Sequence, residues 1–325
     1  MSLLPKKFTS GLGDALVNLL PRLIYFSAER SARTGLRLEA NETFMSIIDV
    51  SRLRIIRISR TNAVYAIDML NYFDYYFSSS KPFSTRVGDT QYEVVDFSTP
   101  RFHEISGFSD FPVLCPSLTE PFITCQQYLD FSRSRNGDVV LDLGCYSGLT
   151  SIAFSKIVGV QGKVVAVEPD PLSYAAAQTN FDFHARINKL NNIFLVRAAV
   201  GADKGKISFS SEGAMGSAAA DIVGTNRGQA TQVESLRLQD IVDAQEITKV
   251  DFIKMDIEGS EERVLAASKG FFDRFKPRII VEPHIVNGRL SDSSVVGALR
   301  SYGYRCNLIE QHGVKLPLIT GEPSN

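Results

Sequence analysis

Val139-Val-Leu-Asp-Leu-Gly-Cys-Tyr-Ser-Gly148 is the stretch of sequence that decides the fold. Its first four residues are typical of a short buried strand, and the glycines that follow predict a turn into a helix over residues 149–158. Gly144 carries no side chain, so the backbone can approach a ligand closely there. A glycine-rich turn between a strand and a helix is typical of the first βα unit of a nucleotide-binding sheet.

Asp142 stands where folds that bind a pyrophosphate usually carry their first glycine. A carboxylate at this position repels a diphosphate that lies over the following helix N-terminus. It suits a cofactor that has no phosphate and carries positive charge, and S-adenosylmethionine, a sulfonium with an amino-acid tail, has both properties. The residues therefore favour a methyltransferase over an NAD-type oxidoreductase, which is the first alternative.

The composition is that of an ordinary globular protein. The chain has 325 residues, 44% of them hydrophobic and 22% charged, which fits one large domain with an accessory region. With 35 basic and 36 acidic side chains there is no reason to expect a nucleic-acid partner, so we expect a small-molecule or glycan acceptor. Four sparse cysteines indicate free thiols in a reducing compartment, the cytoplasm. The oligomeric state stays open.

Residues 12–26 are apolar in character but are interrupted by Asp14 and Pro21. The stretch is too short and too polar to cross a bilayer, and no small-residue cleavage pair follows it cleanly. We expect an amphipathic helix, broken at Pro21, that packs on its own domain or on a partner. Weak contact with a membrane surface is the alternative.

From about residue 138 onward, strand-like and helix-like segments alternate, which predicts a parallel sheet with crossover helices. The expected strands cover residues 139–142, 163–168, 193–197, 250–256 and 278–282. The expected helices cover residues 149–158, 172–184, 261–268 and 293–302. Residues 304–309 and 314–318 are expected to form a closing hairpin. We therefore predict a domain over residues 120–319, followed by a frayed tail over 320–325.

Residues 1–119 are expected to form a helical and β-hairpin cap of α+β type. The hairpin is predicted where residues 85–87 and 92–97 flank a Gly-Asp pair. Five aromatic residues within 71–77 are expected in the core of the cap, with sugar stacking as the alternative. A set of arginines is interpreted as a solvated face, with a phosphate contact as the alternative. These are Arg52, Arg54, Arg57 and Arg60.

Residues 211–229 contain four glycines, four alanines and few large apolar side chains. Such a segment buries little apolar area, so we expect a flexible loop, with a lid over the reaction site as the alternative.

Glu168 ends the second expected strand, beside the strand that carries Asp142. Ligands of open α/β sheets bind at the carboxyl ends of the strands, so Glu168 can accept hydrogen bonds from two ribose hydroxyls. A tight turn with a surface acid is the alternative.

Asp256 ends the fourth expected strand, and Lys254 lies two residues earlier on the same face. A lysine in a strand buried on both faces must be paired, and Asp256 or Glu258 is the nearest partner. We expect this group to line the reaction site, with a structural ion pair as the alternative. Ser260 is interpreted as the cap of the next helix.

His284 follows the next expected strand and titrates near neutrality, so it is a candidate to take a proton from a hydroxyl. A hydrogen-bonded structural histidine is the alternative. Asp256, Glu282 and His284 form a second alternative, a divalent-metal site. Their spacing gives no tight ligand set, so no metal is expected.

With these residues in place, the chain resembles the FkbM-type methyltransferases, a class I family that depends on S-adenosylmethionine. The resemblance covers about residues 92–284, and the last of the following runs is the most family-specific. The runs are Val139-Val-Leu-Asp-Leu-Gly144, Val167-Glu-Pro-Asp170, Ala198-Ala-Val-Gly201 and Phe252-Ile-Lys-Met-Asp-Ile-Glu-Gly-Ser-Glu261.

The resemblance implies a doubly wound, Rossmann-like sheet of seven strands whose last strand is antiparallel. It implies that the glycine loop surrounds the methionine part of the cofactor and that Glu168 holds the ribose. Family members mostly methylate oxygen atoms of sugars, polyketides and other small natural products. O-methylation is therefore the expected activity, with N-methylation or a non-catalytic cofactor-binding protein as alternatives. The candidate cofactor-binding residues are Asp142, Gly144, Cys145, Gly148, Glu168 and Ala199, and the candidate catalytic residues are Asp256, His284 and Lys254.

Overall fold

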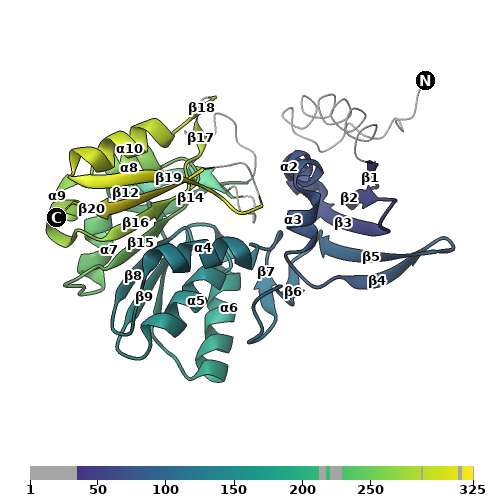
Figure 1. The fold of residues 1–325 in the computed structure, drawn as a ribbon, viewed down its shortest axis with the longest axis horizontal. Coiled ribbons are helices and arrows are strands. Elements are labelled where there is room, and N and C mark those ends of the chain that lie inside the picture. The colour runs from purple at the N-terminus through teal and green to yellow at the C-terminus, as the bar shows by residue number, and fades with distance from the viewer. Residues whose placement is uncertain (1–34, 212–216, 220–228, 287, 314–316, 325) are drawn as a thin grey trace. The chain divides into compact units, whose positions relative to one another are not determined.

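The computed structural model describes residues 35–211, 217–219, 229–286, 288–313 and 317–324 (Figure 1). The expected helix at 12–26 and most of the insert at 211–229 lie outside the described residues. By its packing the chain divides into two compact units, Met1–Phe77 with Pro82–Thr99 and Ser78–Lys81 with Pro100–Asn325. The domain boundary between residues 119 and 120 stays a prediction. None of the described helices is long and apolar enough to cross a membrane.

The smaller unit contains a five-stranded sheet in the order β1-β2-β3-β5-β4. Its strands pair antiparallel except for β3 and β5, which are parallel. The hairpin of β4 and β5 turns at Gly88, which has a positive φ, so the predicted hairpin is confirmed. The elements are β1 (Leu36–Ala40), β2 (Phe44–Asp49), β3 (Arg54–Ser59), η1 (Arg60–Tyr65), α2 (Ala66–Asn71), α3 (Phe73–Phe77), β4 (Phe83–Val87) and β5 (Thr90–Phe97).

The aromatic segment of this unit belongs to its core. Phe73 and Phe77 are buried and their rings stack at a centroid distance of 5.7 Å, which confirms the predicted core packing. The neighbouring arginines are partnered within the unit. Arg52 bonds to Asp74 at 2.6 Å, and the Arg54 guanidinium lies 4.9 Å from the Phe77 ring centroid.

The larger unit is built on a seven-stranded sheet in the order β10-β9-β8-β15-β16-β20-β19 (Figure 1). Neighbours from β10 to β16 are parallel, and β20 is antiparallel to both β16 and β19. The strand order reverses at β8, which confirms the predicted doubly wound, Rossmann-like fold. The strands are β8 (Val139–Leu143), β9 (Lys163–Val167), β10 (Ile193–Val196), β15 (Phe252–Met255), β16 (Arg278–Val281), β19 (Tyr304–Glu310) and β20 (Pro317–Pro323).

The last strand corrects one prediction. β19 and β20 pair as the expected closing hairpin, but the predicted frayed tail at 320–325 is wrong for residues 320–323, which lie in β20 between two other strands. Thr320 is buried, and a Cβ added to Gly321 would lie 2.8 Å from Ile279. Residues 320–323 include polar residues, a glycine and a proline, so they show no strand pattern in the sequence. The position of the strand depends on pairing with β16, which is distant in the sequence.

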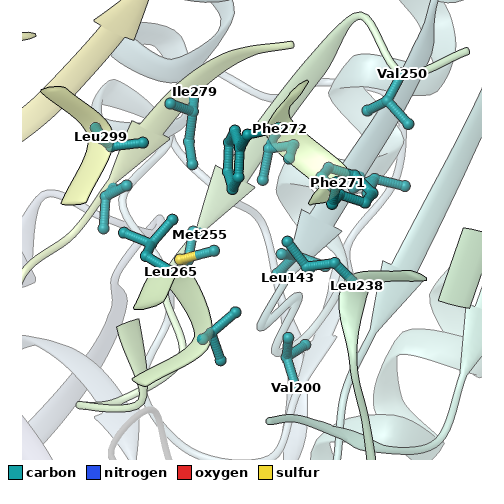
Figure 2. Close-up of a cluster of buried hydrophobic side chains, with 14 of the residues drawn as sticks. Leu143, Val200, Leu238, Val250, Met255, Leu265, Phe271, Phe272, Ile279 and Leu299 are labelled. Atoms are coloured by element: carbon teal, nitrogen blue, oxygen red, sulfur yellow. The ribbon is translucent and has the colours of Figure 1, made fainter. Parts of the chain in front are cut away.

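Helices cover both faces of the larger sheet. The side chains of β8 are apolar on both faces, apart from Asp142, and point alternately into two core clusters. Val140 packs with the group that includes Tyr128 and Phe154, whereas Leu141 and Leu143 join a cluster on the opposite face. Figure 2 shows part of that second cluster, with Leu143 among residues of other elements. One face carries α4 (Phe122–Ser132), α5 (Leu149–Val158) and α6 (Pro171–Asn188), and the other carries α7 (Leu238–Ala244), α8 (Glu261–Ala266), α9 (Lys269–Phe275) and α10 (Asp292–Ser301).

Four further strands form a sheet that the sequence did not predict, in the order β11-β14-β12-β13. β12 and β14 pair across the insert at 211–229, and β13 lies inside the insert and pairs with β12. Such non-local pairing leaves no short-range pattern. These strands are β11 (Ala199–Val200), β12 (Gly205–Ser211), β13 (Ala218–Ala219) and β14 (Gln229–Leu236). Two short pairs complete the unit, β6 (Arg101–His103) with β7 (Val113–Cys115) and β17 (Ile285–Val286) with β18 (Arg289–Leu290).

Candidate functional site

The glycine loop between β8 and α5 is held by the neighbouring strand ends. The backbone N–H groups of Gly144 and Cys145 donate to the carbonyl oxygen of Val167, at 3.0 and 3.1 Å. Gly144 has φ +78°, and a Cβ there would lie 1.8 Å from the carbonyl oxygen of Asp256. The close approach that requires glycine is therefore to the end of β15.

Two other loop residues serve packing. Gly148 has φ +82°, and a Cβ there would come within 2.4 Å of the Phe181 ring in α6. Cys145 is buried in an apolar cluster, and burial raises the pKa of its thiol well above the usual range. Its thiol therefore lies in the core, and its role in cofactor binding stays a prediction.

Glu168 follows β9 and faces the glycine loop. One carboxylate oxygen accepts the N–H of Tyr146 at 2.8 Å and the other accepts the N–H of Asp170 at 2.9 Å. Burial raises the pKa of Glu168 to about 8, although the two N–H bonds act in the opposite direction. Each oxygen keeps a lone pair for a further donor, so the carboxylate can still accept two hydroxyl groups.

Asp142 and Lys254 are buried on adjacent strands in register with one another. The Ser151 hydroxyl donates to Asp142 Oδ2 at 2.5 Å, and Lys254 Nζ lies 3.6 Å from Asp142 Oδ1. Among the described residues, Oδ1 has no hydrogen-bond partner. Burial raises the pKa of Asp142, and Lys254 opposes that shift.

The Lys254 ammonium also links two parts of the site. It donates to the carbonyl oxygen of Gly144 at 2.6 Å and lies 3.3 Å from Asp256 Oδ2. Burial alone would lower the pKa of Lys254, but the carboxylates of Asp256 and Asp142 raise it well above its usual range. The predicted pairing with Asp256 is confirmed, and the alternative pairing with Glu258 is wrong.

Asp256, Glu258, Glu261 and His284 form what we call the His284 cluster. Nε2 of His284 lies 3.6 Å from Asp256 Oδ1 and 3.5 Å from Glu258 Oε2. On the other side of the ring, Nδ1 donates to Glu261 Oε1 at 3.0 Å. Burial lowers the pKa of His284, but the carboxylates of Glu258 and Glu261 outweigh it and raise that pKa well above the usual value.

A tight turn after β15 shapes this cluster. Glu258 and Gly259 have φ +53° and +98°, and the N–H groups of Ile257 and Gly259 donate to Glu261 Oε1 at 3.2 and 3.1 Å. Ser260 occupies the N-cap of α8 but its side chain makes no capping bond, so the predicted capping role is wrong. The Glu261 carboxylate closes the turn in its place.

β16 ends at Val281, so Glu282 and His284 do not share the face of one strand. The Tyr128 hydroxyl donates to Glu282 Oε2 at 2.9 Å, and burial raises the pKa of Glu282 to about 7. The alternative metal trio with Glu282 is therefore wrong in its membership: the potential ligand atoms that lie together belong to Asp256, Glu258 and His284.

The structure brings most of the predicted residues together at the carboxyl ends of the strands. Contacts link Asp142 to Lys254, Lys254 to Gly144 and Asp256, and Asp256 to His284. Ala199 lies in β11 of the four-stranded sheet, and its role in cofactor binding stays a prediction.

Three residues of this region were not among the predicted site residues: Glu120, Tyr128 and Glu261. Glu120 accepts a hydrogen bond from the Thr150 hydroxyl at 3.1 Å, and burial raises its pKa to about 7. Glu120 lies beside the predicted domain boundary between residues 119 and 120, and for that reason it was not considered as a residue of the site. Tyr128 leaves no sequence signal, whereas an acid at the start of a helix was the available signal for Glu261.

The family model described as "Methyltransferase FkbM domain" matches residues 142–306, just over half of the chain. A curated relative is the "31-O-demethyl-FK506 methyltransferase FkbM" of Streptomyces tacrolimicus. It is 27% identical over 202 residues, which cover 52% of this chain and 74% of the relative.

Two solved structures are more distant. A methyltransferase FkbM from Methylobacillus flagellatus KT is 16% identical with a TM-score of 0.44, and the match covers 95% of this chain and 60% of the other. A precorrin-6y C5,15-methyltransferase from Geobacter metallireducens GS-15 is 18% identical with a TM-score of 0.39, over 64% and 90% of the two chains. The family assignment rests on the sequence match. Because that match runs from Asp142 through the His284 cluster into β19, the chain belongs to the FkbM methyltransferase family.

Proposed function

We propose that this protein is an S-adenosylmethionine-dependent methyltransferase that acts on a hydroxyl group of a small molecule such as a sugar or a polyketide. The observation that carries the proposal is the contact between Glu168 and the glycine loop, where a buried carboxylate meets the backbone of the turn. The name of the relative from Streptomyces tacrolimicus, which describes methylation of an oxygen atom, supports the choice of a hydroxyl.

The residues beside the loop fit this cofactor. The free lone pairs of Glu168 suit the two ribose hydroxyls, and the backbone from Gly144 to Gly148 lies where the methionine part would be held. Asp142 adds a second buried carboxylate directly before the loop. Two buried acids make a poor environment for a diphosphate, so the same contacts disfavour a dinucleotide.

The bound cofactor supplies a methyl group that is already activated. The protein contributes position: Lys254 holds the loop carbonyl of Gly144 and a carboxylate oxygen of Asp256 at the same time. Asp256 Oδ1 accepts the hydrogen bond of the acceptor hydroxyl and takes up its proton. His284, which Glu261 orients, lies 3.6 Å from that oxygen and stabilises its position.

Calorimetry tests the cofactor part of the proposal. S-adenosylmethionine is titrated into the wild type, into Glu168→Gln and into Asp182→Asn, an exposed acid of α6 that serves as the control. We expect binding to the wild type and the control, and at least about tenfold weaker binding to Glu168→Gln, because the amide replaces one of the two acceptor oxygens with a donor. Equal affinity in all three proteins contradicts the assignment of Glu168.

Isotope labelling tests the acceptor. Cells that express the wild type or Glu168→Gln are fed methionine with a deuterated methyl group, and their small molecules are compared by mass spectrometry. We expect a labelled product only with the wild type, and tandem fragmentation places the label on oxygen. A label on nitrogen corrects the acceptor atom. Cofactor binding without any labelled product contradicts the enzyme proposal.

A further inference from the structure

The His284 cluster has the arrangement of a metal-binding site. One atom each from Asp256, Glu258 and His284 lie within 4.8 Å of one another. The separations from Nε2 to the two carboxylate oxygens, 3.6 and 3.5 Å, are those between ligand atoms that share one ion, since two bonds of about 2.1 Å at about 115° span this distance.

The fourth residue of the cluster prepares the histidine for such a role. Glu261 is fully buried, its Oε1 accepts the Nδ1–H of His284, and its Oε2 has no hydrogen-bond partner among the described residues. A carboxylate on Nδ1 fixes the ring orientation, so that when an ion binds and displaces the Nε2 proton, the lone pair of Nε2 faces the ion. The backbone bonds to Glu261 hold this second carboxylate in place before any ion arrives.

The charges of the cluster and its exposure agree with this interpretation. Three carboxylates surround one imidazole, so ionised carboxylates outnumber the positive charge that the ring can carry. The side chains of Asp256, Glu258 and His284 are 26, 24 and 21% exposed, which leaves coordination positions open to water or to a substrate. A fully buried ion pair would have no such opening.

We propose that Asp256 Oδ1, Glu258 Oε2 and His284 Nε2 bind one divalent transition-metal ion, with Glu261 as the carboxylate that orients the histidine. Carboxylate oxygens suit Mn²⁺ and an imidazole suits Fe²⁺ or Zn²⁺, and Mn²⁺ serves as the probe in the tests below. This inference is independent of the proposed methyl transfer. If both hold, Asp256 Oδ1 and His284 Nε2 would be ligands of the ion, and the ion, not Asp256 Oδ1, would bind and polarise the acceptor oxygen.

Mn²⁺ binding to the full-length protein, freed of metal with a chelator, tests the site without cofactor or acceptor. Calorimetry and electron paramagnetic resonance are expected to give one bound ion per chain. Glu258→Gln keeps the size of the side chain but removes its charge, and we expect it to weaken binding by about tenfold or more. The control is Glu262→Gln, an exposed acid on the same helix as Glu261, which should bind as the wild type does.

A second measurement does not depend on the stability of a variant. Pulsed electron paramagnetic resonance of the wild type with Mn²⁺ is expected to show the coupling of one imidazole nitrogen, and Glu261→Gln is expected to weaken binding by about tenfold to a hundredfold. No binding at millimolar Mn²⁺, equal binding by Glu258→Gln, or the absence of a nitrogen coupling overturns the proposal. A separate titration with S-adenosylmethionine shows whether the cofactor site fails or holds independently.

Discussion

Lys254 donates a hydrogen bond to the carbonyl oxygen of Gly144 at 2.6 Å, so a side chain of β15 fastens the turn that follows β8. The same ammonium faces the carboxylates of Asp142 and Asp256. One buried cation thus connects the loop proposed to hold the cofactor with Asp256, the residue proposed to contact the acceptor.

Lys254→Met should destabilise the protein strongly. The change leaves the buried Asp142 carboxylate without its ion pair, and breaking a buried pair from one side costs about 3–5 kcal/mol. Urea unfolding measures the loss, and calorimetry should show weaker cofactor binding. Lys249→Met is the control, because Lys249 is half exposed beside Asp251 and such surface pairs contribute about 0–1 kcal/mol. Equal stability of the two variants would show that the buried ion pair of Lys254 does not contribute to the free energy of unfolding.

Gly144→Ala should be among the most damaging small substitutions in the chain. Its methyl group would meet a backbone oxygen at 1.8 Å, and the residue would keep a positive φ. We expect a loss of about 3 kcal/mol or more in the free energy of unfolding. Gly270→Ala in α9 is the matched control, since no atom lies within 4 Å of the added methyl group. There we expect a gain of up to about 1 kcal/mol, and a similar loss at both sites contradicts the contact with Asp256.

Glu168 should give the stability a distinct pH dependence. Its pKa in the folded protein is about 8, well above that of an exposed glutamate, so between those values the folded state binds more protons than the unfolded state. The stabilisation is complete below the unfolded pKa and is lost as the pH rises through about 8. Urea unfolding between pH 5 and pH 9 should show a smaller decline for Glu168→Gln than for the wild type. Parallel pH profiles would mean that Glu168 is ionised throughout.

Asp170 should stabilise the start of α6. It is buried, caps the helix through the N–H groups of Leu172 and Ser173, and accepts a hydroxyl bond from Ser211 at 2.6 Å. Asp170→Ala is expected to cost about 1–2 kcal/mol, measured by thermal unfolding, because the cap is lost. Asp170→Asn keeps a capping oxygen and should cost clearly less. Equal losses in the two variants would mean that the negative charge of Asp170, and not its capping oxygen, provides the stabilisation.

The sequence predicted the sheet because its buried strands are short apolar runs that end at acids or glycines. Asp142, Glu168 and Asp256 each lie at a strand end, and parallel strands bring such ends to one edge. These positions could be predicted from short stretches of sequence. The pairing of Lys254 with Asp256 could be predicted because a lysine in a buried strand needs a carboxylate partner. Membership of β8, β9 and β15 in the site follows from the same local rule.

Other features depend on contacts between distant residues. Glu261 was visible only as an acid in the first turn of a helix, because the sequence does not show that the chain bends back through two positive φ angles at Glu258 and Gly259. The partnership of Tyr128 with Glu282 joins α4 to a strand end 154 positions away. The sheet of β11 to β14 likewise arises from pairing across an insert.

The position of β20 has a consequence for how the protein is made. This strand is synthesised after β19 but lies between β16 and β19. Until residues 317–323 have left the ribosome, the hydrogen-bonding groups along one side of β16 have no strand to pair with. An open edge on an apolar sheet is a template for aggregation. Slow translation or crowded nascent chains should therefore make newly made copies of this protein depend on chaperones that shield the edge.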